Sequence, residues 1–263
     1  MGASGSRSVL IPTLAMLLVA AVVTDVVRRA IGGTGPAARA ASPSRGGAVA
    51  PQAEAVGRDA PLQPNPTDRL DSAARALALA RIENGGSGTY LPAMLEENDS
   101  VLHRWADDRA KRPLRVAVLR GDTVPGFREV FLANIAWAIG RWNGVGLPVW
   151  LEQDPDTAGA DIVVSFADRL DSNRTGRTEL TWQRRGPIVK VQVTLATHMS
   201  DGRQLQPSQM VALALHELGH ALGLGHSPAK TDALYPETSA TDLTSRDRGT
   251  AILLYDVPPG SLK

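Results

Sequence analysis

His216-Glu217-Leu218-Gly219-His220-Ala221-Leu222-Gly223-Leu224-Gly225-His226 stands near the C-terminal end of the chain. The spacing is H-E-x-x-H-x-x-G-x-x-H, and the stretch holds three of the five histidines in the protein. On a helix, His216 and His220 project from one face because they are four residues apart. Gly223 tolerates a positive φ, so it can end the helix and turn the chain. We expect that turn to bring His226 back to the other two imidazoles.

Three imidazoles in this arrangement are a donor set for zinc, which binds ring nitrogens at about 2.0–2.1 Å. Three protein ligands leave a fourth position for water, as in catalytic rather than structural zinc sites. Glu217 lies beside the metal, where its carboxylate can take a proton from the zinc-bound water. The stretch therefore predicts His216, His220 and His226 as zinc ligands and Glu217 as the catalytic base. The competing interpretation is a core helix with incidental histidines, which does not explain their clustering.

The residues before the motif predict the helix that carries it. Ser208 follows Pro207 and is a suitable N-cap, so we expect a helix over residues 209–222. The apolar residues that recur at helical spacing, and would form its buried stripe, are Val211, Leu215, Leu218 and Leu222.

With Ser227 after the third histidine, the motif resembles the metzincin clan of zinc endopeptidases and, within it, the matrixin-like group. The clan's Met-turn, a segment beneath the zinc, is matched by Ala233-Leu234-Tyr235-Pro236, in which Leu234 stands at the methionine position. Leucine is close to methionine in volume and apolarity, so a cost below about 1.5 kcal/mol is expected. The resemblance also implies that residues 236–243 wall a substrate pocket beside the zinc.

The resemblance implies an α+β, metzincin-like zincin fold with a twisted, mostly parallel sheet, an active-site helix and a small C-terminal subdomain. Sequence patterns agree with that order. Strands are predicted at residues 114–119, 148–151, 160–166 and 188–195, with helices at residues 127–142 and after a cap at Thr244 or Ser245.

Residues 188–195 show the cleanest apolar-polar alternation in the chain. Val189, Val191, Val193 and Leu195 share one face of this predicted strand. One interpretation is an ordinary half-buried strand. The other is an edge strand beside the cleft, to which an extended peptide substrate adds as a further strand.

Composition divides the chain into four parts. Residues 1–40 hold an uncharged apolar stretch at 9–24 and read as a signal peptide or a membrane anchor, which predicts an extracytoplasmic (secreted or membrane-anchored) protein. Residues 41–66 are rich in Ala, Gly, Pro and Ser and predict a flexible linker. Residues 67–111 are expected to form an N-terminal helical extension, and residues 112–257 a matrixin-like metalloprotease domain.

Charge and cysteine content exclude several classes. The net charge is +1, which gives no electrostatic footprint for nucleic acid, so we expect no nucleic-acid partner. The resemblance implies a peptide or protein substrate, and we expect a monomer. The chain has no cysteine, hence no disulfide and no lipid-modified cysteine. The thiolate by which matrixin propeptides block zinc is absent too, so any latency must rest on other groups.

These observations predict a zinc-dependent endopeptidase that hydrolyses peptide bonds through a zinc-bound water, with Glu217 as general base. The alternative is a catalytically weak or inactive zinc-binding interaction module, for which Leu234 is the only support in the sequence. A purely structural zinc helix is a third interpretation and predicts no open coordination position.

Overall fold

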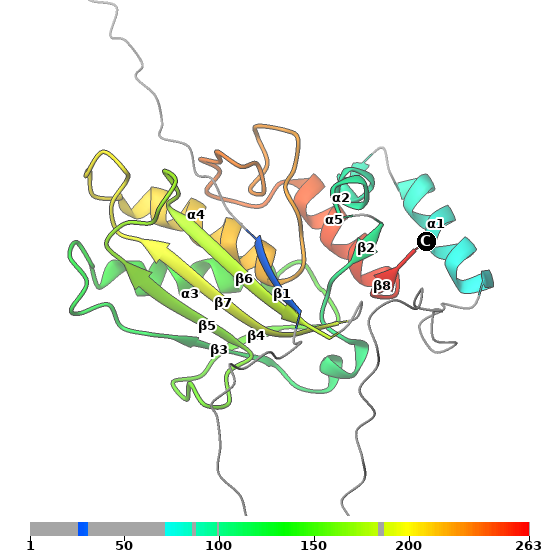
Figure 1. The fold of residues 1–263 in the computed structure, drawn as a ribbon, viewed down its shortest axis with the longest axis horizontal. Helices are drawn as coiled ribbons and strands as arrows, with labels where there is room; N and C mark the ends of the chain where they lie inside the picture. Colours follow the sequence, from blue (N-terminus) through cyan, green and yellow to red (C-terminus); the bar gives the residue numbers. More distant parts are fainter. Residues whose placement is uncertain (1–25, 31–71, 86–87, 99, 184–186, 263) are drawn as a thin grey trace, which may run out of the picture.

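The computed structural model describes residues 26–30, 72–85, 88–98, 100–183 and 187–262. Its largest layer is a six-stranded sheet in the order β1-β6-β7-β5-β3-β4 (Figure 1). The strands are β1 Val26–Ala30, β3 Leu114–Val118, β4 Leu151–Gln153, β5 Ile162–Ala167, β6 Gly176–Trp182 and β7 Ile188–Ala196. Strands β4, β3, β5 and β7 pair in parallel, whereas β6 is antiparallel to β7. The predicted α+β class with a mostly parallel sheet is confirmed.

The central strands follow from branched and aromatic residues that suit a pleated, half-buried surface. In β5, burial alternates along the strand, with Ile162, Val164 and Phe166 buried. This alternation directs one face of the sheet toward the helices.

The interpretation of residues 188–195 as an edge strand that pairs with substrate is wrong. Strand β7 lies inside the sheet, hydrogen-bonded to β5 on one side and to β6 on the other. Its backbone groups are therefore already paired. The strand beyond it, β6, was not predicted, and β1 pairs with the outer side of β6 in parallel.

Two helices, α3 (Val130–Asn143) and α4 (Pro207–Ala221), pack against each other and against the sheet (Figure 1). The indole Nε1 of Trp142 joins them by donating to the carbonyl oxygen of Leu215 at 2.9 Å. Helix α3 begins three residues later than the pattern predicts, after a turn in which Gly126 adopts a positive φ of 74°.

The predicted N-cap of α4 is also wrong. Pro207 occupies the first helical turn, where no amide hydrogen is needed, and Gln206 is the N-cap in place of Ser208. The amide of Gln206 donates to Oε1 of Gln209 at 2.8 Å. The helix consequently starts two residues before the predicted residue 209 and ends at Ala221.

Residues before β3 fold back on the C-terminal part of the chain. This extension contains α1 (Ser72–Gly85), α2 (Leu91–Glu97), β2 (Val101–Leu102) and the 3₁₀ helix η3 (Asp107–Lys111). Strand β2 pairs with β8 (Gly260–Ser261), and α1 and α2 both contact α5 (Ser245–Asp256). Trp105 is fully buried, and its Nε1 donates to the carbonyl oxygen of Ala221 at the end of α4 at 2.9 Å.

Apart from β1, the predicted signal peptide or anchor and the predicted linker lie outside the described residues, so both stay predictions. No helix within the described ranges is long and apolar enough to cross a membrane.

Candidate metal centre

Helix α4 and the turn that follows it bring the three predicted histidines together. The side chains of His216 and His220 are fully buried, with ring centroids 4.6 Å apart. Gly223 ends the helix with φ of 100°, and a Cβ there would lie 2.1 Å from the carbonyl oxygen of His103. Only glycine fits this turn. The turn brings His226 back, so that the ring centroids of His220 and His226 are 4.8 Å apart.

One nitrogen from each histidine contributes to a compact donor set. These ring nitrogens all lie within 4.8 Å of one another. Nε2 of His216 and Nε2 of His220 are 3.0 Å apart. The prediction from spacing, that His226 joins the helical pair, therefore agrees with the geometry.

The outer hydrogen bonds of two histidines fix which nitrogen can bind a metal. Nδ1 of His216 donates to the carbonyl oxygen of Ala233 at 2.8 Å, and Nδ1 of His220 donates to that of Leu224 at 2.7 Å. A carbonyl oxygen only accepts, so each Nδ1 carries the proton and each Nε2 carries a lone pair. Two lone pairs facing each other at this distance repel unless a cation lies between them, so the donor set fits zinc.

Burial keeps these imidazoles neutral, as metal ligands must be. Burial lowers the pKa of His216 to about 3 and holds the pKa of His220 well below its usual value. The pKa of His226 is lowered for the same reason.

Glu217 lies beside the first histidine and is fully buried. Burial raises the pKa of its carboxyl group to about 8, although a hydrogen bond from Thr178 opposes the shift. Oγ1 of Thr178 donates to Oε2 of Glu217 at 2.6 Å. Oε1 has no hydrogen-bond partner among the described residues, which is unusual for a buried carboxylate oxygen.

Strand β6 makes room for that carboxylate. A Cβ on Gly176 would lie 2.0 Å from Oε1 of Glu217, so any side chain larger than hydrogen would displace it. The sequence did not single out Gly176 or Thr178. Their contact with Glu217 depends on how β6 packs on α4, which a local pattern does not reveal.

The segment with the resemblance to a Met-turn lies under α4. Leu234 is fully buried, and a Cβ on Gly219 would lie 2.8 Å from its Cδ2. Its neighbour Ala233 supplies the carbonyl oxygen that orients His216. Leu234 therefore packs directly against Gly219, the residue of α4 that precedes His220.

The carboxylate of Asp247, in the first turn of α5, holds this segment in place. It is fully buried and accepts from the amides of Ala233 at 3.0 Å and Leu234 at 3.4 Å. It also accepts from the amide of Thr244 at 2.9 Å, in a capping box in which Thr244, one of the two predicted caps, is the N-cap. The sequence did not predict that Asp247 also accepts from the amides of Ala233 and Leu234.

Comparison with protein families gives a match to part of the chain. The family model described as Matrixin matches residues 127–256, from the turn before α3 to the end of α5. A search of curated proteins gives no match for this chain.

Proposed function

Because residues 127–256 form a matrixin-like peptidase domain of the metzincin type, we propose that the protein is a zinc-dependent endopeptidase. The observation that carries the proposal is the set of three histidine nitrogens within 4.8 Å of one another. Beside it lies Glu217, with one buried carboxylate oxygen that has no partner in the described part of the chain.

His216, His220 and His226 would hold the ion. When bound, zinc polarises the scissile carbonyl and acidifies the attacking water. The carbonyl oxygens of Ala233 and Leu224 hold two of the imidazoles in orientation, which raises their basicity as ligands.

Glu217 would move the proton. Thr178 occupies Oε2, which leaves Oε1 to accept a proton from water and to pass it to the leaving amine. A carboxyl group with its pKa raised to about 8 suits this work, because a pKa near the working pH favours both acceptance and release.

Strand β6 would align the substrate. Its side away from β7 is where β1 pairs, so an extended substrate would add there in place of β1, through backbone hydrogen bonds. An apolar pocket of about 120 Å³ lies near the start of α4 and would take a medium-sized apolar side chain of the substrate. Thr238, Ser239 and Thr241, from the segment that the resemblance assigns to this wall, contribute to its lining.

The experiment is Glu217→Ala, compared with wild type and with His226→Ala. Zinc content measured by elemental analysis should persist in Glu217→Ala and fall in His226→Ala. Chelator-sensitive hydrolysis of an unstructured protein such as casein should vanish in both variants. Hydrolysis by Glu217→Ala at the wild-type rate would refute its role as base, and a zinc-loaded wild type without hydrolysis would favour the inactive binding module.

We also propose an extracytoplasmic location, supported by the apolar stretch at residues 9–24. Expression with a C-terminal tag, followed by fractionation and N-terminal sequencing, would separate a cleaved signal peptide from a retained anchor. Recovery of the tagged protein in the cytoplasm would refute both.

A further inference from the structure

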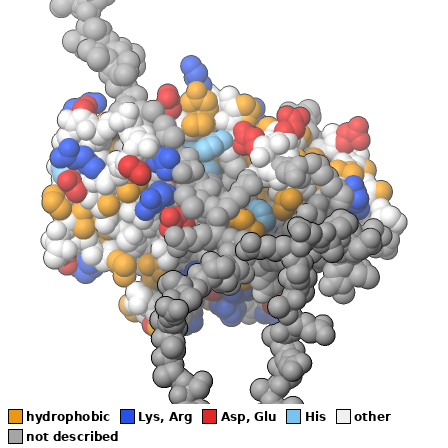
Figure 2. Space-filling view, in the orientation of Figure 1, with side chains coloured by type: hydrophobic (Ala, Val, Ile, Leu, Met, Phe, Trp, Pro, Cys, Tyr) orange, Lys and Arg blue, Asp and Glu red, His pale blue; other side chains and the backbone are white. Residues whose placement is uncertain are grey.

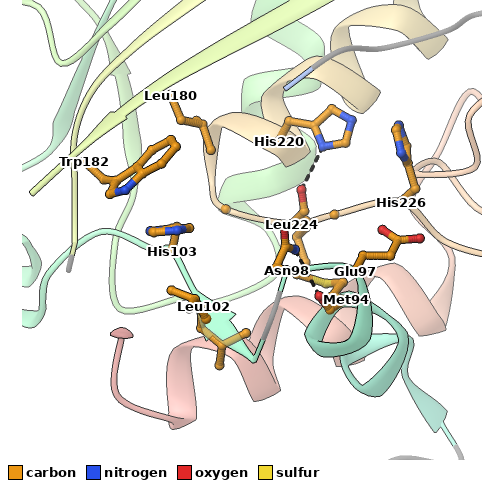
Figure 3. A pocket seen from close by; sticks show the side chains of 13 residues that line it. Met94, Glu97, Asn98, Leu102, His103, Leu180, Trp182, His220, Leu224 and His226 are labelled. Carbon is orange, nitrogen blue, oxygen red and sulfur yellow. Dashed lines mark hydrogen bonds between the residues drawn. The ribbon is translucent and has the colours of Figure 1, made fainter. Parts of the chain in front are cut away.

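A cavity of about 270 Å³ lies beside the histidine cluster and is bordered by His220 and His226 (Figure 3). Leu180 and Trp182 of β6 form another part of its wall. The N-terminal extension contributes Met94, Glu97, Asn98, Val101, Leu102 and His103. The extension lies outside residues 127–256, so this wall is an addition to the part of the chain that matches the family model.

Part of the cavity wall is apolar and part is polar. Met94, Leu102 and Leu180 are buried, and the ring of Trp182 packs on that of His103 with centroids 4.4 Å apart. Such walls suit the aliphatic part of a long side chain, which gains free energy by leaving water.

One formal negative charge borders the cavity. Among the described residues that line it, Glu97 is the only acidic side chain, and there is no lysine or arginine. Glu97 is exposed and has no hydrogen bond or ion pair within the described ranges. Figure 3 shows Glu97 and His226 toward one end of the cavity and Leu180 and Trp182 toward the other. A cavity with an apolar wall section and a carboxylate at one end complements a side chain with an apolar stem and a cationic tip.

The backbone register of β1 shows what an extended segment brings to this half of β6. Arg28 is in register with Leu180, and Arg29 with Thr181. The chain's own segment on this edge therefore places one basic residue, Arg28, in register with a residue that lines the cavity. Figure 2 shows histidine side chains on this face of the molecule, with hydrophobic and acidic side chains around them.

We propose that this cavity is a substrate subsite for a lysine or arginine side chain, and that Glu97 is its specificity-determining residue. The inference rests on the proposed endopeptidase function. An extended substrate paired with β6 directs the basic side chain along Met94 and Leu102 to the carboxylate of Glu97. The extension thus restricts which peptides reach the histidine cluster.

Cleavage-site profiling of the wild type on a peptide library of broad composition is the first step. Lysine and arginine should be enriched at one position within a few residues of the cleaved bond. Two matched peptides are then made that differ only there, with arginine in one and norleucine in the other. The ratio of their kcat/KM values should fall about fivefold in Glu97→Gln, as expected for loss of one partly exposed ion pair.

Glu97→Lys should invert the preference, so that a matched peptide with glutamate is cleaved faster than the arginine peptide. Glu96→Gln is the matched control, because Glu96 is the preceding exposed residue of α2 and does not line the cavity. It should keep the wild-type ratio. Equal ratios in wild type, Glu97→Gln and Glu97→Lys would overturn the proposal.

Binding separates failure of the subsite from failure of the protease. The two peptides, labelled with a fluorophore, are titrated with Glu217→Ala and with Glu217→Ala/Glu97→Gln, and polarisation is followed. Tighter binding of the arginine peptide that depends on Glu97 supports the subsite, even if wild type cleaves nothing and the proposed function fails. Cleavage by wild type without any such dependence in binding or turnover would remove the subsite and leave the protease.

Discussion

At the scale of single residues, the site depends on the absence of a side chain at Gly176. The ideal Cβ there lies 2.0 Å from Oε1 of Glu217 and 2.6 Å from Cδ1 of Leu213. We predict that Gly176→Ala displaces the carboxylate and lowers kcat/KM at least tenfold, while zinc content is kept. Overpacking of this kind should also cost about 1–3 kcal/mol of unfolding free energy. Peptide turnover, elemental analysis and thermal unfolding measure the three quantities.

Gly140→Ala provides the matched control for this prediction. Gly140 lies inside α3, and nothing approaches within 4 Å of a Cβ at that position. An added methyl group there should stabilise the helix by about 0.5–1 kcal/mol and leave turnover unchanged. Wild-type turnover in Gly176→Ala would show that Glu217 does not need its present position.

Residues of the site were predictable only where they are close in sequence. Helical geometry relates His216 to His220, and a glycine turn relates both to His226, so eleven residues sufficed. Thr178 contacts Glu217 from 39 residues away, and that contact requires the pairing order of the sheet. The position of Leu234 beneath the site was predicted because the resemblance supplied it. The hydrogen bonds from the amides of Ala233 and Leu234 to Asp247 were not predictable, because no local sequence pattern indicates them.

At the scale of elements, a hydrogen bond between the start of α2 and α5 connects the extension to Asp247, which holds the segment beneath α4. The hydroxyl of Tyr90 donates to Oδ1 of Asp247 at 3.3 Å, and both side chains are buried. Burial raises the pKa of Tyr90 well above its usual value, so the phenol stays a neutral donor. We predict that Tyr90→Phe lowers the unfolding free energy by about 1 kcal/mol, since a buried acceptor loses a partner. Denaturant unfolding would measure this loss, and the slope of unfolding free energy against denaturant concentration should be the same as in wild type.

Arg81→Gln tests whether any contact between the extension and α5 has the same effect. Arg81 pairs with Asp256 at 3.1 Å, but both side chains are about half exposed. Solvent screening leaves such a pair a contribution below about 1 kcal/mol, so this variant should unfold near wild type. A larger loss in Arg81→Gln than in Tyr90→Phe would contradict the role given to the buried hydroxyl.

The sheet shows how far patterns of elements can be read from the chain. Alternation in residues 188–195 correctly predicts a strand with one buried face. It carries no information on which backbone edges are paired, because pairing depends on neighbours along the sheet. Strand β6 was missed because its glycine, threonine and arginine residues give a weak apolar signal, although four of its positions serve the site or the cavity.

At the scale of the whole molecule, the proposed zinc site connects helix α4 with the segments that pack around its C-terminal end. Its ligands come from α4 and the following turn, and their orientation depends on the carbonyl oxygens of Ala233 and Leu224. Trp105 of the extension in turn binds the end of α4. Bound zinc should therefore add to the stability of the extension, the helix and the segment beneath it together.

Metal removal tests this dependence. Without a cation, the lone pairs of two buried Nε2 atoms face each other at 3.0 Å, so the metal-free fold carries a repulsion that zinc relieves. A ligand that binds only the folded state at 100 times its Kd adds about 2.7 kcal/mol. For a domain of this size that corresponds to a fall in Tm of about 5–10 °C on chelation. Differential scanning calorimetry with EDTA, and after zinc is restored, measures the fall and its reversal.

His226→Ala should begin near the metal-free Tm and respond weakly to either treatment, whereas Glu217→Ala should keep a clear response because it retains all three ligands. A wild-type Tm that does not change on complete removal of zinc would show that the histidine cluster is held by the fold alone.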